Sequence, residues 1–100
     1  MDIKYITRLL ISIKYLDENW EASLKLFIQF MVDLPIGLLD QELEYYLFWL
    51  HVDLDLYEPD PIKRSESKCL YNKEGLPDVI AKYEDKLLKF GINLSNELDI

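Results

Sequence analysis

Apolar residues recur at every third or fourth position along most of this chain, and this spacing constrains the fold more than any other feature. The clearest stripe consists of Trp20, Leu24, Phe27, Met31 and Leu34. Residues with this spacing lie on one face of an α-helix. The alternation of β-branched residues that is typical of half-buried strands is absent from the sequence. The pattern therefore predicts an all-α protein.

Boundary residues define the first two predicted helices. Apolar spacing favours a first helix over residues 3–15. Asp17 is a candidate N-cap for the second helix, because its side chain can accept a hydrogen bond from a free N–H group of the first turn. Pro35 and Gly37 then end that helix, since neither residue favours its continuation.

The second half of the chain predicts two more helices and a long loop. A third helix runs from about residue 39 to residue 54, and residues 57–75 form a loop. In the fourth helix Pro77 occupies the first turn, and Gly91 ends it. The tail from residue 93 is expected to fray. The overall prediction is a small four-helix bundle with a long loop before its last helix.

The third predicted helix is apolar on two faces. One face, of the kind that packs into a core, carries Leu39, Leu43, Leu47, Leu50 and Leu54. The other carries Tyr45, Phe48, Trp49, Val52 and Leu56. A helix of this kind is either central in its bundle or partly exposed to a partner. We expect the central position, with partner contact as the alternative.

Composition predicts a single domain over residues 1–100, because half of the 100 residues are hydrophobic and 30% are charged. Cys69 is the only cysteine, so no disulfide can form within the chain. No stretch reaches the ~18 apolar residues of a membrane helix, and the N-terminus lacks a signal-peptide pattern. We therefore expect a cytoplasmic protein with no membrane partner.

The net charge of −8 is confined to one stretch of the sequence. From Leu26 to Ile62 there is no lysine or arginine, whereas the rest of the chain contains as many acids as bases. Such a stretch repels nucleic acid and attracts cationic surfaces. The acids of this stretch are Asp33, Asp40, Glu42, Glu44, Asp53, Asp55, Glu58 and Asp60. The helix dipole already explains the three acids near the start of the third helix.

The last four of these acids cluster in residues 53–60, and a solvated face and a docking surface both explain such a cluster. Tyr57 favours docking, because tyrosine offers apolar area with a polar tip. Pro59 and Pro61 also favour it, since a stiff segment loses less entropy on binding. The predicted binding residues for a basic protein partner are Asp53, Asp55, Tyr57, Glu58, Asp60 and Trp49.

Catalytic and metal-binding chemistry finds little support in the sequence. His51 is the only histidine and Cys69 the only cysteine, so converging metal ligands are not expected. His51 and Asp55 can pair along one helix face, which is a common surface arrangement. No glycine-rich phosphate loop or nucleophile elbow is present. We expect neither an enzyme nor a bound cofactor or metal.

The C-terminal half resembles the colicin D immunity protein family, whose relatives also accompany contact-dependent growth-inhibition toxins. The resemblance rests on Tyr57-Glu58-Pro59-Asp60, then Gly75-Leu76, and then the amphipathic run Tyr83-Glu84-Asp85-Lys86-Leu87-Leu88-Lys89-Phe90. The first two predicted helices match in pattern rather than in residues. The loop between Asp60 and Gly75 is longer here than in the family.

The resemblance implies a four-helix protein that binds a cognate tRNA-cleaving toxin domain and blocks its basic active-site cleft. In that family, acids imitate the tRNA backbone, and the matching positions here are Asp55, Glu58 and Asp60. The physics is consistent, because a cleft that holds phosphates must be cationic. Aromatic anchors such as Tyr57 and Trp49 would then slow dissociation.

A helical adaptor or regulatory subunit is the alternative hypothesis. Such a protein would bind a partner helix through the stripe of Tyr45, Phe48, Trp49 and Val52. Its binding would depend little on salt, whereas docking through acids predicts an association rate that falls strongly as salt rises.

Overall fold

The computed structural model describes residues 3–95 and confirms the helical class, with no strand in that range. Three long helices, α1 (Ile3–Lys14), α2 (Trp20–Asp33) and α3 (Gln41–Leu54), are followed by the short α4 (Pro61–Arg64). A 3-10 turn, η1 (Lys73–Gly75), leads into α5 (Leu76–Ala81) and α6 (Glu84–Leu88).

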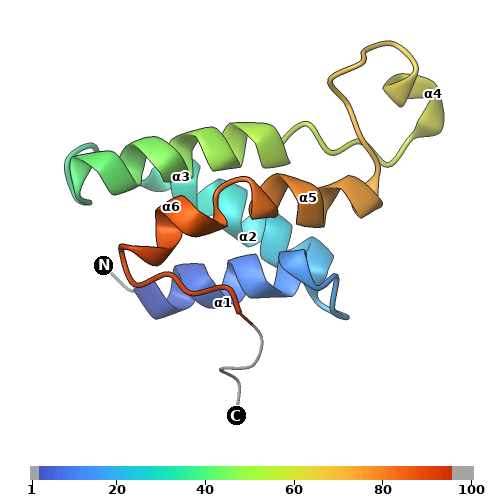
Figure 1. Ribbon diagram of the computed structural model, residues 1–100. Helices are drawn as coiled ribbons and strands as arrows, with labels where there is room; N and C mark the ends of the chain where they lie inside the picture. Colours follow the sequence, from blue (N-terminus) through green and yellow to red (C-terminus); the bar gives the residue numbers. More distant parts are fainter. Residues whose placement is uncertain (1–2, 96–100) are drawn as a thin grey trace.

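The helices pack around one core. Helix α1 contacts α2 and α5, and α3 contacts α2, α5 and α6. Figure 1 shows α1 and α3 at opposite edges of the body, with α5 and α6 crossing in front of α2. Every long helix supplies fully buried side chains, which are Ile6, Leu10, Ile13, Phe27, Leu47, Leu50 and Leu54, joined by Leu76, Ile80, Leu87 and Ile92 from the C-terminal part.

The start of α2 corrects the predicted cap. The helix begins at Trp20 with Asn19 as its N-cap, and not directly after Asp17. Asp17 Oδ1 instead accepts hydrogen bonds from the Asn19 N–H (2.8 Å) and the Ser12 hydroxyl (2.6 Å). Leu16 has a positive φ of 49°, which turns the chain sharply. Asp17 therefore stabilises the turn between α1 and α2 rather than the helix itself.

The predicted fourth helix is divided in two. Pro77 lies in the first turn of α5, as predicted, and Gly91 with φ of 87° follows the end of α6. Between the helices, the Lys82 and Tyr83 N–H groups donate to the carbonyls of Val79 and Ile80, three residues back. These tighter bonds interrupt the regular helical ladder, so α5 and α6 are separate elements.

Two further expectations need correction. The loop over residues 57–75 contains α4 and is closed by an isolated bridge between Tyr57 and Tyr71. The tail does not fray at its start, because Leu94 is buried and its carbonyl accepts a hydrogen bond from Lys14 Nζ (3.1 Å). The remainder of the predicted tail, residues 96–100, lies outside the described residues.

Candidate partner-binding surface

The acidic segment, residues 53–60, leads from the last turn of α3 into a closed loop. The Glu58 N–H donates to the Tyr71 carbonyl (2.8 Å), and the Tyr71 N–H donates to the Leu56 carbonyl (3.4 Å). These bonds hold the two ends of the loop together, while α4 buries none of its residues. Figure 1 shows the α4 segment projecting beyond the end of α3.

Asp53 forms hydrogen bonds within the protein and is not free at the surface. Its Oδ2 atom accepts a hydrogen bond from the Tyr83 hydroxyl (2.6 Å), and its backbone carbonyl accepts one from the Tyr71 hydroxyl (2.6 Å). Burial and this bond to Asp53 raise the pKa of Tyr83, and burial together with the charge of Asp53 raises the pKa of Tyr71. Asp53 thereby ties α3 to the loop and to the junction of α5 and α6.

Glu58 and Asp60 shape the loop that carries them. Asp60 is the N-cap of α4, and its Oδ1 atom accepts a hydrogen bond from the Ile62 N–H (2.9 Å). Glu58 Oε2 in turn accepts from the Asp60 N–H (3.2 Å). The Arg64 guanidinium donates to the carbonyls of Glu58 (2.7 Å) and Pro59 (3.1 Å). A base from outside the base-free stretch therefore lies against this part of the segment.

Asp55 differs from its neighbours. It is exposed at the C-cap of α3, and its carboxylate makes no hydrogen bond or ion pair within residues 3–95. Tyr57 is half-buried and packs edge-to-face against Trp20, with 5.5 Å between ring centroids. Burial, followed by the charge of Glu21, raises the pKa of Tyr57. Asp55 is thus available to a partner, while Tyr57 is partly committed to the fold.

Trp49 lies on an exposed aromatic face, so the expected central position of α3 is wrong. We define this aromatic face as Tyr45, Phe48, Trp49 and Val52; the first three are exposed. Phe48 and Trp49 stack edge-to-face at 5.3 Å. Since successive residues turn by about 100° around a helix, this face is opposite the buried leucines of α3. The core covers only one of the two apolar faces.

The aromatic face and Asp55 share one side of α3. Phe48, Val52 and Asp55 follow the spacing that aligns residues along a helix face. An unpaired carboxylate therefore lies at the end of a row of exposed apolar side chains. This arrangement combines the apolar contact area and the charge that a partner-binding surface needs.

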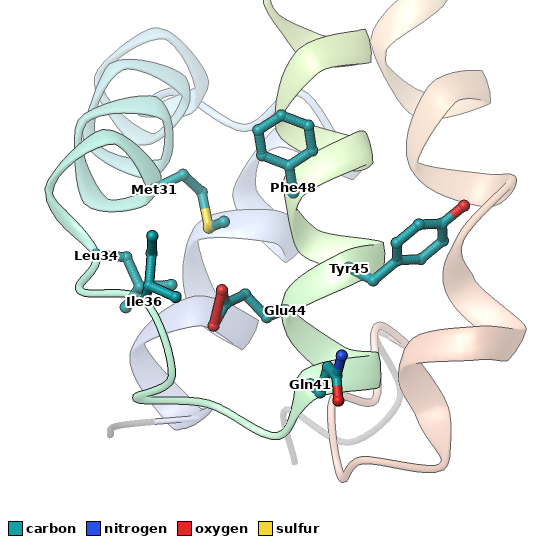
Figure 2. Close-up of a pocket in the computed structure, with 7 residues that line it drawn as sticks. All are labelled: Met31, Leu34, Ile36, Gln41, Glu44, Tyr45 and Phe48. Carbon is teal, nitrogen blue, oxygen red and sulfur yellow. The ribbon is translucent and has the colours of Figure 1, made fainter.

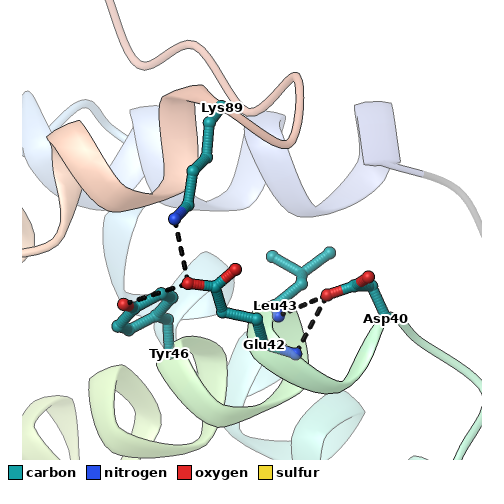
Figure 3. A network of polar contacts seen from close by, with 5 residues as sticks. All are labelled: Asp40, Glu42, Leu43, Tyr46 and Lys89. Carbon is teal, nitrogen blue, oxygen red and sulfur yellow. Dashed lines mark hydrogen bonds and ion pairs between the residues drawn. The ribbon is translucent and has the colours of Figure 1, made fainter.

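The acids at the start of α3 are paired within the protein. Figure 3 shows Asp40 Oδ1 accepting hydrogen bonds from the N–H groups of Glu42 (2.9 Å) and Leu43 (3.2 Å), as an N-cap does. The Glu42 carboxylate forms an ion pair with Lys89 of α6 (2.9 Å) and accepts a hydrogen bond from the Tyr46 hydroxyl (3.4 Å). Tertiary packing therefore supplies a base to a stretch that has none in sequence.

The turn between α2 and α3 carries residues that the sequence analysis missed. Ile36 is 96% exposed, and Leu38 is exposed as well. Two apolar side chains inside a turn that contains Pro35 and Gly37 are unusual, because turns generally carry polar residues. The presence of two apolar residues in a turn was the feature of the sequence that could have indicated an exposed apolar surface here.

Residues 3–95 contain no assembled metal site. No group of three or more histidine, cysteine or carboxylate side chains there is arranged to hold a metal ion. His51 Nδ1 lies 3.0 Å from the Phe48 carbonyl, and no pairing with Asp55 occurs. Cys69 is exposed and free.

Comparisons with known proteins give no relative from which to transfer a role. No protein-family model, no curated protein and no solved structure matches this chain. Among the described residues, no helix has the length and apolar character needed to cross a membrane.

Proposed function

We propose that this protein is an immunity protein that acts in the cytoplasm, where it binds and neutralises a cognate tRNA-cleaving toxin domain. The observation that carries the proposal is the unpaired Asp55 carboxylate at the end of the exposed aromatic face. Negative charge concentrated near apolar anchors is the complement of a cationic nuclease cleft. The motif Tyr57-Glu58-Pro59-Asp60 adds the similarity to colicin D immunity proteins.

In this proposal the protein inhibits by occlusion and catalyses nothing itself. Asp55, Glu58 and Asp60 present negative charge to the cleft in place of the phosphates of tRNA. Trp49 supplies apolar contact that slows dissociation. Asp53 takes a positioning role, because its carboxylate is already bound to Tyr83. The proposal treats α5 and α6 together as the broken counterpart of the fourth helix of an immunity-type bundle.

Isosteric neutral substitutions provide the test. Asp55→Asn, Glu58→Gln and Asp60→Asn remove three charges, while the amide oxygens can still accept the bonds that shape the α4 loop. The triple variant should retain its stability and bind the toxin domain more slowly at low salt. The measurement is stopped-flow association with that domain, together with inhibition of tRNA cleavage.

A second triple variant controls for the change in net charge. Glu18→Gln, Asp78→Asn and Asp85→Asn also remove one glutamate and two aspartates, all exposed and outside the base-free stretch. This control should associate at nearly the rate of the unmodified protein. Equal association rates for both triple variants would show that the acidic segment is not the docking surface.

A helical adaptor remains the second candidate, and the exposure of Tyr45, Phe48 and Trp49 favours it. An adaptor would bind a partner helix mainly through apolar contact. The two functions differ in salt dependence, because only the immunity protein depends on attraction between charges. A complex whose association rate is unchanged between low and high salt would favour the adaptor.

A further inference from the structure

A groove lies between the end of α2 and the first half of α3, and it shares Tyr45 and Phe48 with the aromatic face. Its volume is about 390 Å³, and its lining residues are Met31, Leu34, Ile36, Gln41, Glu44, Tyr45 and Phe48. Figure 2 shows Met31, Ile36, Glu44 and Phe48 around the space between the two helices, with Tyr45 pointing away from α2. None of the residues that line the groove belongs to the α4 loop.

The walls of the groove are mostly apolar. Ile36 is 96% exposed and Phe48 is 47% exposed. Binding is favoured by about 25 cal/mol for each Å² of exposed apolar surface that a partner removes from water. Most of the exposed large apolar side chains lie in the same stretch of the chain, namely Leu26, Val32, Ile36, Leu38, Tyr45, Phe48, Trp49 and Ile62. The groove therefore lies in the stretch of the chain that holds most of the exposed apolar side chains.

The groove carries negative charge and no positive charge among its lining residues. All of them belong to the base-free stretch from Leu26 to Ile62. The Glu44 carboxylate lines the groove while accepting a long hydrogen bond from the Gly37 N–H (3.2 Å). An adjoining depression shares Gln41 and Tyr45 and adds Asp40 and Glu42. The apolar walls are thus bordered by carboxylates, of which Glu42 is paired with Lys89 of α6.

This charge selects among the possible occupants. A second copy of the chain would bring the same acids to the same face, and like charges in contact oppose association. A basic partner meets no such repulsion. The exposed residues on α3 follow helical spacing, which a partner helix with apolar residues at i, i+3 or i+4, and i+7 can match. The occupant that fits is a cationic amphipathic helix.

A neighbouring cavity of about 340 Å³ adjoins α1 instead of α3. It is lined by Tyr5 of α1 together with residues of α2 and the turn, including Leu26, Phe30, Asp33 and Leu38. Its lining, like that of the groove, contains an acid and no base, so the mapping of bound peptides distinguishes the two sites.

We propose that the groove between α2 and α3 binds an amphipathic helix of a basic partner, with an apolar side chain between Ile36 and Phe48 and lysine or arginine side chains beside Glu44. The inference rests on the proposed function, because it assigns this helix to the toxin that the protein neutralises. It adds a second contact, apart from the acidic segment.

Selection from a peptide library tests the groove directly. The probe is a library of 18-residue helical peptides with randomised apolar and charged positions, displayed against the immobilised full chain. Enriched peptides should carry apolar residues at helical spacing with flanking lysine or arginine. Their contact site is then mapped by amide chemical-shift changes in the labelled full chain, and the largest changes should fall on residues 31–48.

Matched variants identify the walls of the groove. The double variant Ile36→Ser, Phe48→Ser should weaken binding of the enriched peptides by about tenfold or more, as removal of interface anchors does. The control Ile62→Ser, Leu88→Ser removes exposed apolar side chains outside the groove and should leave affinity unchanged; Leu88, 51% exposed, matches Phe48. All four residues are exposed, so folding should be retained, which circular dichroism checks.

Several outcomes would overturn the inference. They are a failure to enrich any peptide, enrichment of acidic peptides, shift changes confined to residues 53–60 or to α1, and equal loss of affinity in both double variants. The result is separable from the proposed function. The groove can bind peptides even if the toxin test fails, and toxin inhibition can depend on Asp55, Glu58 and Asp60 even if the groove stays empty.

Discussion

The acidic segment and the aromatic face both differ from what their residue types predict, but in opposite ways. Residues 53–60 are strongly charged, yet most of their carboxylates accept hydrogen bonds inside the protein, as Asp53 does from Tyr83. The aromatic face is apolar and helically spaced, yet Tyr45, Phe48 and Trp49 are exposed to solvent. Most carboxylates of the acidic segment are therefore already hydrogen-bonded within the protein. Most side chains of the aromatic face, in contrast, are exposed to solvent.

The difference shows that burial and pairing are properties of neighbours in space. A carboxylate is free only if no donor from another element reaches it, and an apolar side chain is buried only if another element covers it. Candidate binding residues therefore shift from the whole acidic segment toward Asp55 and the side chains beside it. The following changes test this comparison.

The largest expected effect separates the two faces of α3. Leu50 is fully buried, so Leu50→Ala should lower the free energy of unfolding by about 2–5 kcal/mol. Phe48→Ala removes a larger but exposed side chain and should change it by less than about 1 kcal/mol. Urea denaturation measures both values. Equal destabilisation by the two substitutions would contradict the exposure of the aromatic face.

The next effect separates the two aspartates at the end of α3. Asp53→Ala removes the acceptor of the Tyr83 hydroxyl and should lower the free energy of unfolding by about 1–2 kcal/mol. Asp55→Ala should change it by no more than about 0.5 kcal/mol, because this carboxylate has no partner in residues 3–95. Thermal and urea unfolding provide the comparison. A larger cost for Asp55→Ala would reverse the assignment.

Alkaline pH should weaken the fold through Tyr83 and Tyr71. Burial raises the pKa of both side chains above 10.0, so the folded protein keeps protons that the unfolded chain loses. The unfolded state then binds fewer protons, and stability falls as the pH rises above about 10. Tyr83→Phe should lower stability by about 1 kcal/mol at neutral pH and show a shallower alkaline decline. Parallel pH profiles for the two proteins would contradict this.

The smallest expected effect concerns the single unpaired charge. Asp55→Asn should slow association with the toxin domain by up to about fivefold at low salt, as expected for an exposed charge pair. The effect should shrink at high salt because ions screen exposed charges. Asp53→Asn serves as the contrast and should change the association rate less. Stopped-flow measurements at two salt concentrations check both variants.

Local patterns predicted much of the fold. Helical apolar spacing gave the long helices close to their observed bounds, and Pro77 and Gly91 have the predicted positions at the ends of the C-terminal helices. The break at Tyr83 was missed, because Tyr83 has no helix-breaking character of its own. The Asp17 cap was also wrong, since the Ser12 hydroxyl competes for its carboxylate.

The candidate site was predictable only in part. The sequence marked residues 53–60 and Trp49, but it did not separate Asp55 from Asp53, because the donors to Asp53 come from residues far along the chain. The groove beside α3 was missed for the same reason, since it forms between Ile36 in a turn and Phe48 on a helix.

By itself the sequence determined the helical class, the long helices and the location of the excess negative charge, because these depend on residues near one another along the chain. Only the tertiary structure decided which apolar face of α3 is covered, which carboxylates are paired and where a groove is open. These properties depend on contacts between distant elements, such as Lys89 with Glu42 and Tyr83 with Asp53.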